Sequence, residues 1–138
     1  MSLFKADIIL QPSGVTVQPS PIHGLGVFSR HIISKGALIE RAPLILLETS
    51  DKEYLQHTTL YHYYFVVKNS KTPAALGLGY SSLYNHSYHA NARYEVSVRN
   101  QCLDIIAVRA IAAGEEITLN YNGRVDDNSQ VFFPNPST

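Results

Sequence analysis

Short apolar runs, separated by glycine, proline and polar residues, dominate the hydrophobic pattern of this chain. Runs of this length, rich in β-branched and aromatic side chains, are typical of β-strands. The pattern predicts strands near 8–10, 15–17, 27–29, 37–40, 44–48, 61–67, 75–84, 94–98, 103–108 and 116–119. Eight to ten short strands with little helix predict a mainly β fold.

Turn and breaker residues predict how these runs connect. Residues 11–14 join the first two runs as a hairpin, and the loop 23–26 leads into the third run. Pro43 lacks the N–H that a sheet requires, so we expect a bend between the fourth and fifth runs. The cap signature in residues 50–53 predicts one short helix within 49–62.

Length and charge narrow the class of protein. At 138 residues the chain is long enough for one hydrophobic core, so we expect a single domain. Eleven basic and eleven acidic residues cancel, which disfavours direct nucleic-acid binding. Cys102 lies in an apolar run and is interpreted as a core thiol, because a single cysteine forms no internal disulfide and no cysteine zinc cluster.

The chain shows no leader-like N-terminus and no stretch of eighteen apolar residues. We therefore expect a soluble intracellular protein without membrane contact. No cluster of five or more basic residues marks a nuclear signal, so nuclear and cytoplasmic placement both stay open.

Three motifs in a fixed order carry the chemistry. They are His23-Gly24-Leu25-Gly26-Val27-Phe28, then Tyr84-Asn85-His86-Ser87 with Asn91, and finally Gly114-Glu115-Glu116-Ile117-Thr118-Leu119-Asn120-Tyr121. A Gly-x-Gly pair alone is common, but this combination rarely coincides by chance. The chain resembles the SET-domain family of protein lysine methyltransferases over residues 15–123, and is most similar to minimal viral and bacterial members.

The resemblance implies a SET fold of the β-clip type, with small curled sheets and a knot-like crossing of the middle and late motifs. It places one SET domain at 1–123, followed by a tail at 124–138 that either caps the active site or simply docks on the domain. It implies S-adenosylmethionine as cofactor and a lysine on an extended protein segment as substrate, with a histone tail as the first choice. Minimal viral members act as dimers, so a homodimer is expected.

Two other readings compete with this enzyme. A non-catalytic SET module would bind a peptide or protein partner, but the presence of Asn85, Tyr121 and the glycine pair argues against it. A metal-dependent hydrolase would need a cluster of ligands that the six scattered histidines do not offer, so no metal site is predicted.

The glycine pair and the middle motif are the predicted cofactor site. Glycines 24 and 26 let the backbone approach a ligand closely. By resemblance, the Asn85 amide holds the amino acid end of the cofactor, the His86 backbone contacts the adenine, and the His86 ring pins the crossing. The predicted cofactor-binding residues are His23, Gly24, Leu25, Gly26, Tyr84, Asn85, His86, Tyr121 and Phe132.

Tyr121 matches the catalytic tyrosine of the family, and Tyr63 and Tyr94 are predicted to share its site. Free lysine titrates near ~10.4, so an aromatic channel must remove water, and a neighbouring sulfonium must disfavour the ammonium, before transfer. The Tyr121 hydroxyl would orient the amine. The predicted substrate channel contains Tyr63, Gly79, Tyr80 and Leu119, with peptide pairing near 77–81. Leu119 favours di- or trimethylation, although the product state stays open.

Overall fold

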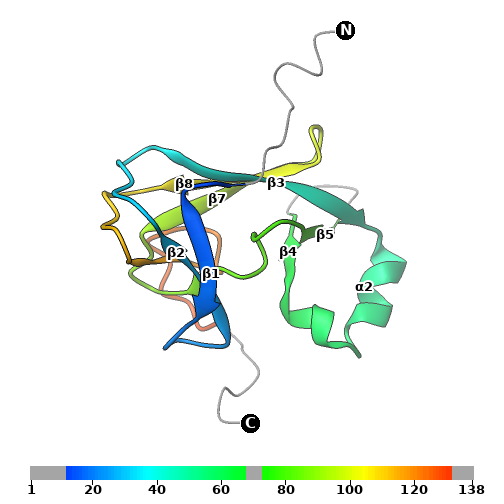
Figure 1. The fold of residues 1–138 in the computed structure, drawn as a ribbon. Coiled ribbons are helices and arrows are strands. Elements are labelled where there is room, and N and C mark those ends of the chain that lie inside the picture. The colour runs from blue at the N-terminus through cyan, green and yellow to red at the C-terminus, as the bar shows by residue number, and fades with distance from the viewer. Residues whose placement is uncertain (1–11, 68–72, 132–138) are drawn as a thin grey trace, which may run out of the picture.

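The computed structural model describes residues 12–67 and 73–131, and two β-sheets form the framework of this part of the chain (Figure 1). One sheet has the strand order β1 (Val15–Pro19), β2 (Leu25–Ser29), β9 (Glu116–Leu119) and β6 (Asn85–His86). The other has the order β4 (Tyr64–Val66), β5 (Ala74–Gly77), β3 (Leu38–Leu47), β8 (Cys102–Ala107) and β7 (Ala92–Ser97). The predicted mainly β architecture with little helix is confirmed.

Only the second run of the predicted N-terminal hairpin belongs to the described residues. The first run, 8–10, lies outside the described residues, whereas the second run forms β1. β1 pairs antiparallel with β2, placing Val17 opposite Val27. The loop between them contains Gly24, whose φ of 47° lies in the left-handed region that glycine adopts without steric cost.

β3 runs without interruption through Pro43, so the predicted bend there is wrong. Pro43 lies opposite Cys102 of β8, while the neighbouring Leu44 N–H donates to the Gln101 carbonyl at 2.9 Å. The proline nitrogen therefore faces β5, whose pairing with β3 begins only at Leu44 opposite Gly77. A proline at this position interrupts no ladder hydrogen bond, because the missing N–H falls just beyond the end of β5.

The polar segment after β3 forms two helical pieces where one was predicted. The α-helix α2 (Thr49–Leu55) is followed by the 3₁₀-helix η1 (Thr59–His62). The N-cap of α2 is Glu48, whose backbone N–H donates to the Asp51 carboxylate at 2.9 Å, so the helix begins before the predicted cap. Because η1 takes up the start of the aromatic run 61–67, β4 is only three residues long.

The hydrophobic core lies between the two sheets and is formed by alternate strand positions. Leu103 and Ile105 of β8 and Ile117 of β9 are fully buried there. Cys102 is 7% exposed, in agreement with its interpretation as a core thiol. None of the helices in the described part of the chain has the length and apolar character needed to cross a membrane.

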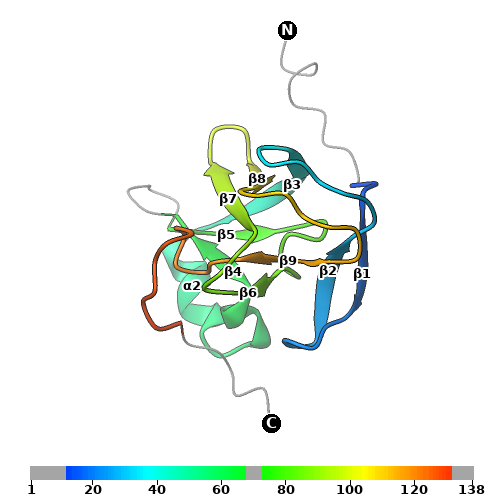
Figure 2. The same cartoon turned by 90° about the vertical axis from the view of Figure 1, so that its left-hand side faces the viewer.

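The middle and late motifs meet in the parallel pairing of β6 with β9, where Asn85 lies opposite Thr118 and His86 opposite Leu119. Figure 2 shows β6 and β9 near the centre of the molecule, between β1 and β2 on one side and α2 and β4 on the other. This pairing brings segments about thirty residues apart in sequence into one site.

Candidate active site

Two neighbouring cavities lie around the β6–β9 crossing and share Tyr63 and Tyr121 as a common wall. The larger, about 690 Å³, is called here the tyrosine cavity, because five tyrosines line it: Tyr63, Tyr64, Tyr84, Tyr94 and Tyr121. The smaller, about 360 Å³, is called the glycine-loop cavity and is lined in part by Ile22, His23, Gly24, Leu25, Leu83, Asn85 and His86. Two adjacent cavities with a shared aromatic wall suit a reaction between two ligands that enter separately.

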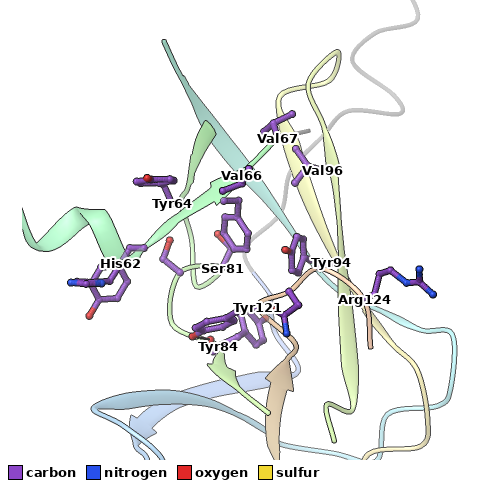
Figure 3. A pocket seen from close by; sticks show the side chains of 15 residues that line it. His62, Tyr64, Val66, Val67, Ser81, Tyr84, Tyr94, Val96, Tyr121 and Arg124 are labelled. Atoms are coloured by element: carbon purple, nitrogen blue, oxygen red, sulfur yellow. Dashed lines mark hydrogen bonds between the residues drawn. The ribbon is translucent and has the colours of Figure 1, made fainter. Parts of the chain in front are cut away.

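The tyrosine cavity gathers all three predicted catalytic residues, Tyr63, Tyr94 and Tyr121. Figure 3 shows Tyr94 and Tyr121 in its lining. Tyr94 projects from β7, and its ring packs edge-on against Phe65 with a centroid distance of 5.0 Å. Burial raises the pKa of the Tyr94 hydroxyl. The exposed guanidinium of Arg124 lies at the outer edge of this cavity and pairs with an aspartate in the same segment, while the rest of the lining carries aromatic, aliphatic and neutral polar side chains.

Tyr121 is fixed at both ends by the middle motif. Its backbone N–H donates to Nδ1 of His86 at 3.0 Å, and its hydroxyl donates to the Tyr84 carbonyl at 2.5 Å. Burial raises the pKa of the Tyr121 hydroxyl, and nearby Tyr63 and Glu116 raise it further. Tyr121 is therefore a neutral phenol at physiological pH, with its proton directed at a carbonyl.

The His86 ring supports Tyr121 from the side of β6. It packs edge-on against Tyr88 with a centroid distance of 4.4 Å and lies 5.3 Å from the Tyr121 ring. Burial lowers the pKa of His86, so the neutral imidazole is favoured. Because Nδ1 accepts from the Tyr121 N–H, the imidazole proton is assigned to Nε2. This arrangement agrees with the predicted role of the ring in pinning the crossing.

Asn85 connects the glycine loop with β9. Its Nδ2 lies among three acceptors: the His23 carbonyl at 3.0 Å, the Leu25 carbonyl at 3.2 Å and the Glu116 carboxylate at 2.9 Å. These acceptors fix the amide orientation, so Oδ1 points away from them. The side chain is therefore held in one orientation before any ligand arrives.

Gly26 has a structural reason that the sequence did not predict. It does not line the glycine-loop cavity, but a Cβ atom there would lie only 2.3 Å from Oε1 of Glu116. That carboxylate also accepts from the Ser20 hydroxyl at 2.8 and 2.9 Å. Glycine at position 26 thus makes room for the carboxylate that orients Asn85.

Several predicted site residues do not line either of the two cavities. Leu119 is fully buried in the core, and Tyr80 packs against that core. Gly79 has a φ of 61° and lies beside a buried glutamate, Glu40. Tyr84 lines the tyrosine cavity but not the glycine-loop cavity, and Phe132 lies outside the described residues.

The adjacent acidic residues of the late motif face different partners, as expected of strand neighbours. The Glu115 carboxylate accepts from Arg109 at 2.7 Å and from Asn91 Nδ2 at 2.9 Å. Asn91 also accepts the Thr118 N–H at 2.9 Å, so it holds β9 in place. Within residues 12–67 and 73–131, no group of three or more histidines, cysteines or acids is arranged to hold a metal ion.

Four of the residues that the sequence reasoning missed are polar or aromatic groups in or beside the cavity walls. His62 and Ser82 line both cavities, and Tyr64 lines the larger one. Glu40 lines neither of the two, but it accepts a hydrogen bond from Tyr84, which lines the larger one. Only Glu40 had a readable signal, because an acid interrupts an otherwise apolar predicted strand. The other three follow from the path of η1 and of the turn after β5, which local patterns do not specify.

The matched family is the SET domain, over residues 24–122, and the chain belongs to this family. It is 32% identical over 112 residues to the histone-lysine N-methyltransferase of Schizosaccharomyces pombe that is specific for histone H3 lysine 37. That match covers 79% of this chain and 74% of the relative. A solved structure from Plasmodium falciparum, assigned as a histone methyltransferase, shares 30% identity with a TM-score of 0.66, over 82% of this chain and 95% of that one.

Proposed function

We propose that this chain is a histone-lysine N-methyltransferase that uses S-adenosylmethionine as methyl donor. The observation that carries the proposal is the position of Tyr121 in the shared wall of the two cavities, with its hydroxyl fixed on the Tyr84 carbonyl. The two relatives described above, both assigned to histone methylation, support the same activity.

The residues of the glycine-loop cavity fit such a cofactor. The cavity, at about 360 Å³, lies within the range of small-molecule sites and combines apolar walls with an oriented amide. Asn85, with its Oδ1 directed away from its own acceptors, would hold the amino acid end, while His23, Gly24 and Leu25 offer backbone groups. When bound, S-adenosylmethionine supplies an electrophilic methyl group on a sulfonium.

The tyrosine cavity would receive the lysine side chain. Tyr63, Tyr94 and Tyr121 would flank the lysine chain with aromatic rings, and the displacement of water would disfavour the ammonium form and lower the lysine pKa. The Tyr121 phenol is neutral, so it does not act as the base that removes the amine proton. Because its own proton is directed at Tyr84, its oxygen would accept a hydrogen bond from the amine and align the nitrogen lone pair.

The extended peptide around the lysine would lie along β4. The backbone N–H groups of Leu78, Tyr80 and Ser81 already donate within the chain, which makes the predicted pairing edge at 77–81 less suitable. β4 is the terminal strand of the described five-stranded sheet, and its residues line the tyrosine cavity. Strand addition at an edge gives affinity through main-chain hydrogen bonds and leaves one side chain free to enter the cavity. Homodimer formation remains a separate prediction.

The proposal is tested by incubating the purified protein with methyl-labelled S-adenosylmethionine and each recombinant core histone. The expected result is label on histone H3, mapped to lysine by mass spectrometry, together with cofactor binding measured by calorimetry. A Tyr54→Phe variant is the control, because Tyr54 is 78% exposed on α2 and lines neither cavity. A folded protein that binds cofactor but labels no histone would contradict the histone assignment, and one that binds no cofactor would contradict the activity itself.

A further inference from the structure

A buried carboxylate, Glu40, contacts one residue in the wall of the tyrosine cavity, Tyr84. Glu40 is 3% exposed, and both of its partners are neutral: Oε2 accepts the Tyr80 N–H at 2.9 Å and Oε1 accepts the Tyr84 hydroxyl at 2.8 Å. The described residues form no ion pair with it, and burial raises its pKa. A buried acid without a cation is less stable than an apolar side chain of similar size, so packing does not explain its presence.

The turn that approaches this carboxylate is shaped to receive it. Gly79 has a φ of 61°, and a Cβ atom there would lie 2.5 Å from Oε2 of Glu40. The turn continues into Ser81 and Ser82, which line the tyrosine cavity, and then into Tyr84. Glu40 therefore ties β3 to the segment that walls the site.

The same carboxylate is hydrogen-bonded to the residue whose carbonyl accepts the Tyr121 hydroxyl. Tyr84 is 1% exposed, and its ring is anchored at its far end by Glu40. Its backbone carbonyl accepts the Tyr121 hydroxyl at 2.5 Å. Tyr84 therefore links the Glu40 carboxylate to the carbonyl that receives the Tyr121 proton, through one side-chain and one backbone hydrogen bond.

We propose that Glu40 is a positioning residue for methyl transfer, which acts through Tyr84 to orient the Tyr121 hydroxyl toward the reacting amine. This inference rests on the proposed function and assigns to Glu40 a role in rate. The residue touches neither ligand, because it lines neither cavity. Its loss should therefore lower kcat and leave cofactor affinity and peptide KM within about twofold.

A double-mutant cycle on kcat tests this role. Tyr84→Phe removes only the hydroxyl that Glu40 holds, and Glu40→Leu removes both contacts; each should lower kcat about tenfold in the parent protein. Each should lower it less than twofold in a Tyr121→Phe background, because the affected hydroxyl is already gone. Glu40→Gln keeps the volume; its amide oxygen can accept the Tyr80 N–H and its NH2 group can donate to the Tyr84 hydroxyl, so it should retain kcat within about threefold. Glu53→Leu, an exposed acid on α2, is the control and should leave kcat unchanged.

Equal losses of kcat in the two backgrounds would overturn the inference, since they would indicate a general structural defect. If Glu40→Leu does not fold, Tyr84→Phe decides alone. An NMR readout that needs no turnover accompanies the cycle: the Cζ resonance of Tyr121, assigned from Tyr121→Phe, should move in Tyr84→Phe but not in Glu53→Leu. An unmoved resonance would refute the positioning role. Absence of any transfer by the parent protein would instead refute the proposed function, and the NMR result would still decide whether Glu40 orients Tyr121.

Discussion

Replacing Gly26 with alanine should disrupt the cofactor site through a residue that does not line it. The added Cβ would lie 2.3 Å from Oε1 of Glu116, 3.0 Å from its Cδ and 3.0 Å from Cβ of Ser20. The carboxylate can swing away, but it then loses the hydrogen bonds from Ser20 and Asn85. Hydrogen bonds to charged groups contribute about 1.5–3 kcal/mol each, and partial rehydration offsets some of this loss. We expect a net destabilisation of about 2 kcal/mol.

Thermal unfolding and calorimetry with S-adenosylmethionine measure the two consequences. A loss of about 2 kcal/mol should lower Tm by roughly 6–10 °C in a domain of this size. Cofactor affinity should fall about tenfold, because Asn85 is no longer held in one orientation. Gly14→Ala is the matched control, since a Cβ there has no atom within 4 Å. If Gly26→Ala matched Gly14→Ala in both Tm and affinity, the role assigned to Glu116 would be refuted.

Three further predictions concern stability and pH. Leu119→Ala should lower the free energy of unfolding in urea by about 2–5 kcal/mol, because the side chain is fully buried. Leu38→Ala, at a 51% exposed position, should lower it by less than about 0.5 kcal/mol. Equal losses in the two variants would contradict the core position of Leu119. Burial lowers the pKa of His86, so below pH ~6.5 the unfolded chain binds a proton more readily than the folded chain does. The folded protein should therefore lose stability as pH falls. Between pH 7 and pH 5, Tm should fall less steeply in His86→Asn than in the parent. Arg109 holds the pKa of Glu115 at about 2, so ionised Glu115 stabilises the fold above pH ~4.3, and this stabilisation is lost as pH falls toward 2. In Glu115→Gln, Tm should therefore fall less steeply over this acid range. The same dependence of Tm on pH as in the parent would contradict this.

Strand positions were predictable because the alternation of side chains has a fixed period, but the effect of a proline was not. Pro43 is harmless because its nitrogen faces the side of β3 where β5 has already ended. That side is set by the pairing of three strands far apart in sequence. The start of the helix after β3 was missed for a similar reason, since Glu48 rather than a typical cap residue begins it.

Site residues were predictable where the side chain itself carries the expected chemistry. Tyr63, Tyr94 and Tyr121 were expected together and line one cavity. Gly26 shows the limit of such reasoning: its missing side chain makes room for Glu116, and only the fold brings these two residues together. Leu119 shows the same limit, because a leucine two residues before Tyr121 can face either the channel or the core, and here it is buried in the core.

The central claim is that a fixed, neutral Tyr121 hydroxyl promotes transfer of a methyl group to lysine. The most direct measurement compares single-turnover methylation of histone H3 by the parent protein and by Tyr121→Phe, with cofactor affinity measured in parallel. Removing one preorganised hydrogen-bonding group from a water-excluded site typically costs about 10²–10³ in rate. We predict a loss of that size with cofactor affinity within about threefold, since the phenol ring remains in the shared wall. Turnover within threefold of the parent would contradict the account.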